Sequence, residues 1–526
     1  MAKRFICTPT EPVVETRQGK LRGFKLDDIY TFYGIPYAQA KRFQAPQPVE
    51  PWEGVRDALS YGYVCPLMEQ DVPNKEELVP HRFWLMDENC QNLNVWTTSL
   101  DPKAQKPVMV WLHGGGYTAG SAIEHVAYEG DHLCEYGDVV VVSVNHRLNV
   151  LGYMDLSAYG DKYKNSANAG NADLVAALQW VHDNIANFGG DPENVTIFGQ
   201  SGGGEKVIAL MNTPAADGLF HKGIIESGVT CMNAGNKENG KPLAQVMLKE
   251  LGLTEAEVEK LETVPYPELA KAYMAGVRAV KNSQAYVGSW PVQNDWWVGN
   301  PRAVGFTEHA KTIPVLIGSV MGEFCFERGV QNKYELTEAE ALALVKEKYG
   351  EHTDKLVELF KAAYPGKNLT DLLYVDTYFR GPTREFIAKR VEEKCAPTYT
   401  YLFDYDMPID GGKVAWHCSE IPFAFHNTDR TPLFNVPGET DRLQERICGA
   451  FVHFARYGTP QVDSLPEWKP STEGDEAVMM FDKVCELRHN FDAELQEALL
   501  ASGTQTQMTL VDFLAPDADN GVLVVH

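Results

Sequence analysis

The chain has 526 residues, of which 44% are hydrophobic and 23% charged, a composition typical of a soluble globular protein. Its 72 acidic residues outnumber its 47 basic ones, and the net charge of −25 argues against binding to nucleic acid or to anionic membranes. No apolar run is long enough to span a membrane, and no N-terminal signal peptide is visible. We therefore expect a cytoplasmic protein, and a mature secreted chain whose signal had been removed would have the same features.

The pattern of the first half predicts strands alternating with helices. Residues 13–34 alternate in polarity between turn residues, which predicts a small N-terminal β-meander. Residues 106–112 and 138–148 hold apolar runs typical of strands buried on both faces, and 194–199 form a third. Residues 172–190 have helical periodicity and end in two glycines. The apolar face of that helix would consist of Leu174, Leu178, Val181 and Ile185. This order predicts a mostly parallel sheet covered by helices.

The second half adds further strands and two helical insertions. Strands are expected within 222–227, 313–319 and 397–405. The insertions cover approximately 237–281 and 336–394. Each contains the spacing of a capping box, at Thr254 and Glu257 in the first and at Thr337 and Glu340 in the second. Nothing in the composition marks a domain boundary, so we expect a single domain over residues 1–526.

One serine stands inside a glycine cluster between a strand and a helix. Residues 199–203 read GQSGG, which fits G-x-S-x-G in the context of a nucleophile elbow, with Ser201 as the nucleophile. Such a turn strains the backbone at the serine, which is why small residues flank it. It also places the hydroxyl at a helix N-terminus. The alternative is a glycine-rich turn with an incidental serine.

A second glycine loop follows the strand at 106–112. Residues 114–116 are three consecutive glycines, whose N–H groups are unobstructed and suit an oxyanion hole. The alternative is a phosphate-binding loop, but the sequence has neither GxxxxGK[ST] nor GxGxxG, and its negative charge does not favour a nucleotide. The cysteines lack metal-type spacing, so no metal site is expected.

A serine nucleophile needs a base and an acid, which in this architecture follow it in the order Ser, acid, His. His417 lies on a loop beyond the strand expected at 397–405, from which it can reach the carboxyl edge of the sheet. It is favoured over His221, His309, His352 and His426. Glu323 lies just past another apolar strand and is the candidate acid, with an ordinary loop carboxylate as the alternative.

Together these residues resemble the type-B carboxylesterases, the family that includes cholinesterases and bacterial para-nitrobenzyl esterases. The similarity extends from about residue 13 to about residue 485. The segments that carry it are TFYGIPYAQAKRF (31–43), PWEGVRDA (51–58), DENCQNLNVW (87–96), HGGGYTAGS (113–121), VNHRLNVLGY (144–153), 168–204 and LFHKGIIESG (219–228). The resemblance implies an α/β-hydrolase fold with a large, mostly parallel central sheet flanked by helices and with helical insertions over the active site.

The resemblance also implies roles for single residues. It implies the triad Ser201, Glu323 and His417. The backbone N–H groups of Gly115, Gly116 and Gly202 would form the oxyanion hole. It places Ser227 where the family keeps a buried serine near the triad.

Three residues near the site depart from the family pattern. Gln200 stands where many members have Glu, which removes a charge and weakens the case for a choline ester. Gly202 stands where Ala is usual, and Cys418 replaces the glycine after His417.

The implied activity is hydrolysis of small-molecule carboxylic esters through an acyl-enzyme, without metal or cofactor. Amide, lactone or thioester hydrolysis by the same triad stays open, as does the choice between monomer and dimer. A non-catalytic adhesion or scaffold protein of the family is disfavoured, because the serine, the histidine and the glycine loop are all present.

Two further expectations concern residues outside the triad. Cys65 and Cys90 fall where secreted members form a disulfide, which a reducing compartment would oppose. Trp290, Trp296 and Trp297 would either line a substrate pocket or pack in the core.

Overall fold

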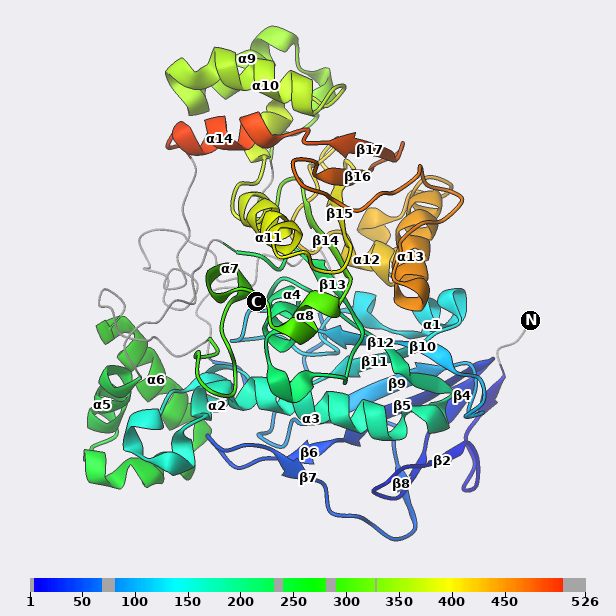
Figure 1. Cartoon of the computed structure of the whole chain (residues 1–526), viewed down its shortest axis with the longest axis vertical. Helices are drawn as coiled ribbons and strands as arrows, with labels where there is room; N and C mark the ends of the chain where they lie inside the picture. The colour runs from blue at the N-terminus through cyan, green and yellow to red at the C-terminus, as the bar shows by residue number, and fades with distance from the viewer. Residues whose placement is uncertain (1–3, 69–80, 231–239, 281–289, 327–328, 505–526) are drawn as a thin grey trace.

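The computed structural model describes residues 4–68, 81–230, 240–280, 290–326 and 329–504. In this part of the chain, twelve strands form one sheet through the middle of the molecule (Figure 1). In spatial order they are β1 (Phe5–Ile6), β4 (Phe24–Leu26), β5 (Ile29–Pro36), β9 (Asn92–Thr97), β11 (Val140–Val144), β10 (Lys106–Leu112), β12 (Gly190–Gln200), β13 (Lys222–Glu226), β14 (Val315–Val320), β15 (Thr398–Phe403), β16 (Ala477–Phe481) and β17 (Glu486–His489). The predicted α/β fold with a large central sheet is confirmed.

The central strands, from β11 to β16, are all parallel. They are buried nearly throughout, except for the first half of β12, which explains why these segments read as almost continuous apolar runs. Strands β1, β4, β5 and β9 pair antiparallel on one side, and β17 pairs antiparallel on the other. Because parallel strands run the same way, the residues after β10, β12, β13, β14 and β15 meet at one edge of the sheet.

The N-terminal strands do not form the single small sheet that we expected, because they divide between two sheets. The predicted strands exist, but β4 and β5 join the central sheet. Strands β2 (Val13–Glu15) and β3 (Lys20–Arg22) pair instead with β8 (Val55–Asp57) in a separate three-stranded sheet. Strands β6 (Ala38–Gln39) and β7 (Gln47–Pro48) form a further pair. The division arises because β3 takes a parallel partner more than thirty residues away, a long-range pairing that local alternation does not encode.

Helices pack on both faces of the sheet. The α-helices are α1 (Asp131–Gly137), α2 (Asn149–Tyr153), α3 (Ala169–Asn184), α4 (Gly202–Met211), α5 (Lys241–Glu250), α6 (Tyr266–Val280), α7 (Pro301–Val304), α8 (Glu308–Thr312), α9 (Glu338–Tyr349), α10 (Thr353–Ala363), α11 (Arg380–Glu392), α12 (Ile421–Ala424), α13 (Thr440–Tyr457) and α14 (Ala493–Ala501). The 3₁₀ helices are η1 (Val126–Tyr128), η2 (Ser157–Tyr159), η3 (Asp161–Tyr163), η4 (Ser166–Asn168), η5 (Ile185–Phe188), η6 (Pro214–Ala216), η7 (Glu255–Glu262), η8 (Lys333–Glu335), η9 (Gly350–His352), η10 (Leu369–Tyr374), η11 (Thr428–Arg430) and η12 (Pro432–Phe434).

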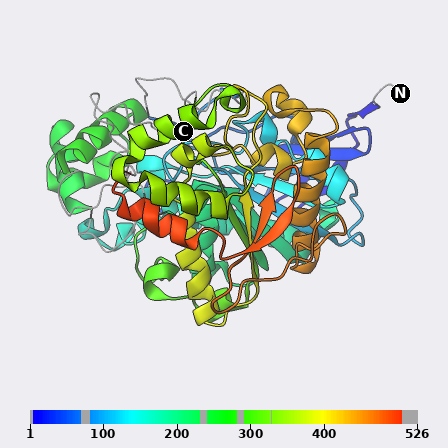
Figure 2. The same ribbon diagram turned by 90° about the horizontal axis from the view of Figure 1, so that it is seen from above.

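Alternate residues of each strand enter different cores. Val108 and Val110 of β10 pack in the core that contains α3 and α4. Trp111, which follows Val110 and points to the other face of the sheet, packs in the core that contains α13. The same alternation holds at β16, where Val478 contacts the α14 side and Met479 the α13 side. Figure 2 shows α14 (red) and α13 (orange) on either side of these C-terminal strands. The predicted apolar face is buried, although its last residue, Ile185, belongs to η5 and not to α3.

Both predicted insertions are helical where the structure describes them. The first contains α5, η7 and α6, and residues 237–239 and 281 of its expected range lie outside the described part. The second contains α9, α10 and α11. The two expected capping boxes, Thr254 with Glu257 and Thr337 with Glu340, are both formed. In Figure 1, α5 with α6 and α9 with α10 lie at opposite ends of the molecule.

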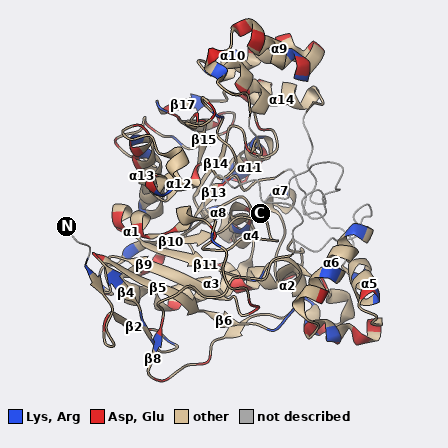
Figure 3. Cartoon of the chain, turned by 180° about the vertical axis from the view of Figure 1, so that it is seen from behind, with Lys and Arg blue, Asp and Glu red and all other residues tan. Residues whose placement is uncertain are grey.

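Charged residues concentrate on the outer helices, whereas the central strands are almost free of them (Figure 3). This distribution suits a sheet whose two faces are both covered. Within the described ranges, no helix is both long enough and apolar enough to cross a bilayer.

Candidate active site

Ser201 occupies the sharp turn between β12 and α4. Its φ of 56° and ψ of −125° lie outside the regions that L-residues prefer, as an elbow requires. Its N–H donates to the carbonyl of Glu226 on the neighbouring strand at 2.8 Å. A Cβ on Gly203 would collide with the carbonyl oxygen of Leu112, so no other residue fits this turn without movement. The strand, turn and helix predicted around Ser201 are therefore present.

The glycine loop after β10 lies directly against the first turn of α4. Gly115 and Gly116 have φ values of 79° and 60°, which glycine adopts without strain. A Cβ added to Gly202 would lie 2.5 Å from the nitrogen of Gly116 and closer still to its Cα and carbonyl oxygen. Among the described residues, the N–H groups of Gly115 and Gly116 have no hydrogen-bond acceptor. The structure thus brings the three predicted oxyanion glycines together beside the elbow.

Glu323 and His417, which are 94 positions apart in the sequence, are in direct contact. The Oε2 atom of Glu323 lies 2.5 Å from Nδ1 of His417. The backbone N–H of His417 also donates to the carbonyl of Glu323 at 2.7 Å. Both side chains are fully buried. Glu323 turns out of β14 with a φ of 23°, another strained position at the same edge of the sheet.

Ser227 holds the second oxygen of this carboxylate. Its hydroxyl donates to Oε1 of Glu323 at 2.8 Å, and the backbone N–H of Val320 donates to the same atom at 3.0 Å. These two bonds fix the plane of the carboxylate, so that Oε2 faces His417. The expected place of Ser227 close to the triad agrees with this contact.

The imidazole of His417 is enclosed by aromatic rings and by the side chain before the elbow. Phe379 stacks on it with ring centroids 5.0 Å apart, and Phe324 lies at 4.9 Å. Nε2 of Gln200 is 3.3 Å from both ring nitrogens, and the thiol of Cys418 donates to Oε1 of Gln200 at 3.2 Å. The ring therefore lies at the elbow.

Within the described residues, no hydrogen bond joins the Ser201 hydroxyl to either nitrogen of this ring. Catalytic hydrogen bonds in free enzymes are often long and tighten only when substrate binds.

Burial dominates the proton equilibria of this pair. Desolvation lowers the pKa of His417 below its usual value, although the nearby Glu420 and Asp376 carboxylates oppose the shift. Desolvation raises the pKa of Glu323, and the donors from Val320 and Ser227 oppose this. The imidazole is therefore neutral near pH 7, the form in which it can accept a proton.

One charged residue near the site was missed from sequence. Lys206 is fully buried on α4, and its ammonium donates to the carbonyl of His113 at 2.9 Å, immediately before the glycine loop. The signal was present, because a glutamate and a lysine, Glu205 and Lys206, interrupt an otherwise apolar helix of ten residues. A charge in that position is unexpected for a helix packed into the core.

Of the three tryptophans, Trp290 and Trp297 are buried and Trp296 is partly buried. Trp290 packs edge-on against Tyr117, next to the glycine loop, with ring centroids 5.0 Å apart. Trp290 and Trp297 also line a cavity of about 30 Å³ together with Tyr117, a space for about one water molecule. Trp296 does not line that cavity.

Cys65 and Cys90 are buried free thiols, so the disulfide of secreted relatives is not formed. Burial, with a smaller contribution from Cys65, raises the pKa of the Cys90 thiol. The Cys90 thiol therefore stays protonated at neutral pH.

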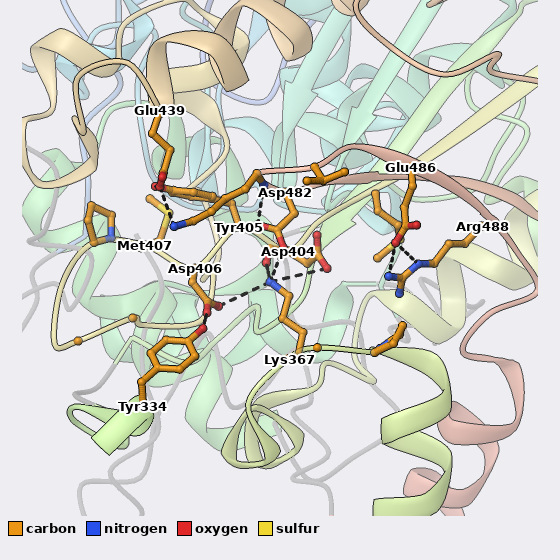
Figure 4. Close-up of a pocket in the computed structure, with 18 residues that line it drawn as sticks. Tyr334, Lys367, Asp404, Tyr405, Asp406, Met407, Glu439, Asp482, Glu486 and Arg488 are labelled. Atoms are coloured by element: carbon orange, nitrogen blue, oxygen red, sulfur yellow. Dashed lines mark hydrogen bonds and ion pairs between the residues drawn. The ribbon is translucent and has the colours of Figure 1, made fainter. Parts of the chain in front are cut away.

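A larger cavity of about 620 Å³ contains none of the predicted site residues (Figure 4). It lies beyond the carboxyl ends of β15 and β16, where Lys367 makes ion pairs with Asp404, Asp406 and Asp482. No group of His, Cys, Asp or Glu in the described ranges is arranged to hold a metal ion.

The comparisons with known proteins agree with this architecture. The family model described as "Carboxylesterase family" matches residues 10–498. The chain is 31% identical to the para-nitrobenzyl esterase of Bacillus subtilis (strain 168) over 507 residues, which cover 94% of this chain and 99% of the relative. It is also 31% identical to phenmedipham hydrolase of Pseudarthrobacter oxydans over 90% of this chain and 95% of the relative.

Solved structures show the same similarity. An esterase from anaerobic Clostridium hathewayi, described as able to hydrolyse aliphatic aromatic polyesters, superimposes with a TM-score of 0.92 at 51% identity and covers 95% of this chain and 100% of its own. A thermophilic PNB esterase superimposes with a TM-score of 0.75 at 30% identity, over 93% of this chain and 100% of its own. The chain therefore belongs to the carboxylesterase family and is an ester hydrolase with the α/β-hydrolase fold.

Proposed function

We propose that this carboxylesterase cleaves its substrates with a triad formed by Ser201, His417 and Glu323, and that Gly115, Gly116 and Gly202 provide the oxyanion hole. The observation that carries the proposal is the 2.5 Å contact between Glu323 and His417 at the elbow that presents Ser201. Together, a nucleophile on a strained turn, a neutral imidazole and a buried carboxylate supply what acyl transfer needs.

In the first step, Oγ of Ser201 attacks the ester carbonyl carbon while Nε2 of His417 takes its proton. The carbonyl oxygen becomes negatively charged and is stabilised by the glycine N–H groups; in the described part of the chain, those of Gly115 and Gly116 have no acceptor that would compete for them. Glu323 stabilises the imidazolium. When the tetrahedral intermediate collapses, the alcohol leaves with the proton from His417.

In the second step, His417 takes a proton from water, whose oxygen attacks the acyl carbon. Collapse of this intermediate breaks the bond to Ser201, returns the proton to Oγ and releases the carboxylic acid. No cofactor enters either step.

The names of the relatives suggest the class of substrate. The compounds in these names are a para-nitrobenzyl ester, phenmedipham and an aliphatic aromatic polyester. We infer that small carboxylic esters with an aromatic group are substrates, and a panel of esters with varied acyl length and alcohol bulk would rank them. An amide, a lactone and a thioester in the same panel test the alternative acyl substrates.

The decisive test combines covalent labelling with two variants. A fluorophosphonate is expected to label the folded wild-type protein at one serine, and Ser201→Ala should lose both the label and the activity. Glu323→Gln should lower kcat by about 10⁴-fold, because the neutral amide favours the wrong imidazole tautomer. Folded protein that takes no label, or a Ser201→Ala variant with wild-type turnover, would contradict the proposal.

A further inference from the structure

Lys206 carries a buried side-chain amine that makes no ion pair with any carboxylate of the described residues. The residue is inaccessible to solvent, and within the described part of the chain its contacts are the hydrogen bond to the His113 carbonyl and the ring of Tyr117 at 5.6 Å. It makes no ion pair there. A desolvated cation without a paired anion is unfavourable, and a methionine or leucine would suit the apolar face of α4 better. The position of this lysine therefore calls for an explanation other than stability.

Burial shifts the pKa values of Lys206 and of the ionisable groups around it toward their neutral forms. Burial lowers the pKa of Lys206 to about 7, and the carboxyl groups of Glu205 and Glu124 oppose the shift only in part. Burial raises the pKa of Glu205 to about 8 and that of Glu124 to about 7. His113 and His146 also face the ammonium, and burial holds both of them neutral.

The two contacts of Lys206 lie at the two ends of the glycine loop. His113 precedes the three glycines, and Tyr117 follows them. The backbone between these residues contains positive φ angles at Gly115 and Gly116, and no acceptor among the described residues binds the N–H groups of these two glycines. A loop of glycines is also the segment with the most conformational freedom to lose. The carbonyl of Gly115 accepts from the N–H groups of Thr118 and Ala119 at 3.2 and 3.0 Å, so the loop is held from within at its far side, and Lys206 adds a hydrogen bond at its start.

The first turn of α4 makes this contact possible. Side chains are absent at Gly202 and Gly203, where a Cβ would meet the backbone of Gly116 and of Leu112. The loop therefore packs directly on the helix, and the side chain of Lys206, one turn further along, reaches the carbonyl of His113.

We propose that Lys206 is a positioning residue that clamps the glycine loop at His113 and Tyr117, so that the N–H groups of Gly115 and Gly116 are held ready for the oxyanion. The proposal rests on the proposed function, because it assigns Lys206 a role in the same oxyanion hole. Preorganised donors are worth most when they do not reorient during the reaction, and a displacement of about 1 Å is sufficient to lose much of their effect.

The test compares Lys206→Met with Lys222→Met. Lys222 is also largely buried, but it is the first residue of strand β13, whose other end leads to the active site, and its side-chain nitrogen bonds to Asn194. For each protein, kcat and KM are measured on a para-nitrophenyl ester and normalised to the sites titrated by a fluorophosphonate. Lys206→Met should lower kcat by about 10- to 100-fold with KM within about threefold, because the loss falls on the transition state. Lys222→Met should keep wild-type kcat.

The rate of phosphonylation provides a second readout. The phosphonyl oxygen occupies the oxyanion position, so Lys206→Met should slow labelling by a similar factor while the final stoichiometry stays at one. Merely structural damage would lower the labelled fraction instead. If Lys206→Met does not fold, Lys206→Gln takes its place, because it removes the charge but keeps an N–H donor. Lys206→Gln is expected to fold, with a kcat and a labelling rate between the wild-type values and those predicted for Lys206→Met.

Wild-type kcat and labelling rate per titrated site in the folded Lys206 variant would overturn the inference. That result leaves the proposed triad intact, because only a Ser201→Ala protein that still turns over would contradict the triad. The two failures are therefore distinguishable in the same assay.

Discussion

Replacing Gly202 by the alanine that related esterases usually carry should damage this enzyme. By helix propensity alone, Ala at the first position of α4 would stabilise the helix by up to about 1 kcal/mol. The packing predicts the opposite effect on activity. A Cβ at this position would lie 2.5 Å from the nitrogen of Gly116, and the Cα and carbonyl oxygen of Gly116 are nearer still.

The size of the effect follows from this overlap. Ordinary contacts of a Cβ begin near 3.4 Å, so the Gly116 backbone has to move by roughly 1 Å away from the elbow. Misplacing a catalytic group by about 1 Å costs on the order of 100-fold in rate, which is about 2.7 kcal/mol of transition-state stabilisation. Because all three colliding atoms belong to the backbone, no side-chain rotation can relieve the contact.

The assay is steady-state hydrolysis of a para-nitrophenyl ester per titrated active site, together with the melting temperature. Gly202→Ala is expected to lower kcat by about 100-fold with little change in KM, because the oxyanion hole contributes mainly to the transition state. The melting temperature should change by no more than a few degrees.

Gly381→Ala is the matched control. Gly381 also lies in a helix, α11, but a Cβ there would meet no atom within 4 Å beyond its chain neighbours and its own helix backbone. Because Pro382 follows and disfavours a helical residue with a Cβ, the gain in helix propensity is offset, and the variant should be fully active with a stability changed by no more than about 1 kcal/mol. Wild-type kcat in Gly202→Ala would refute the reasoning, because it would mean that the loop is not packed on α4 as tightly as the distances state.

Two other changes probe the base and the acid. Gln200→Glu places a carboxylate beside the imidazole of His417 and should raise its pKa, so the acidic limb of the kcat/KM profile moves to higher pH. Because the base acts in its neutral form, activity at pH 5–6 should fall while activity at pH 8 is retained, and an unshifted limb would contradict this. Ser227→Ala removes one of two donors to Oε1 of Glu323 and should lower kcat about 10-fold at unchanged KM, measured on the same ester. An unchanged kcat would show that Val320 alone orients the carboxylate.

Much of this fold could be predicted from sequence because its central strands are buried on both faces. Residues 138–148 and 194–199 read as apolar runs between turn signals, and both contain strands of the central sheet. Local capping signals predicted the helix start at Thr337 equally well. These features depend on neighbours in the chain, so they can be read from it.

Features that depend on long-range packing could not be predicted in this way. The division of the N-terminal meander between two sheets depends on the pairing of β3 with β8. The contact of Lys206 with His113 depends on how closely a loop approaches a helix residue 93 positions away. The sequence showed only that a charged residue interrupts an apolar helix, not what it contacts.

The strain in the backbone is itself part of how the site is built. Three neighbouring parallel strands are each followed by a non-glycine residue with positive φ: β12 by Ser201, β13 by Ser227 and β14 by Glu323. Each such residue costs about 1–3 kcal/mol, so the surrounding structure has to impose it.

Hydrogen bonds between adjacent strands do so. The N–H of Ser201 donates to Glu226 at 2.8 Å, and that of Ser227 donates to Gly318 at 2.8 Å, so each turn is tied to the strand beside it. Ser227 links the three strand ends, because its hydroxyl bonds to Glu323 and the residue before it, Glu226, accepts the N–H of Ser201. A mutation that loosens one of these strand ends should therefore disturb the next. If the proposed triad is correct, reactivity depends on a sheet edge whose strain is distributed over three strands, rather than on the geometry of the elbow alone.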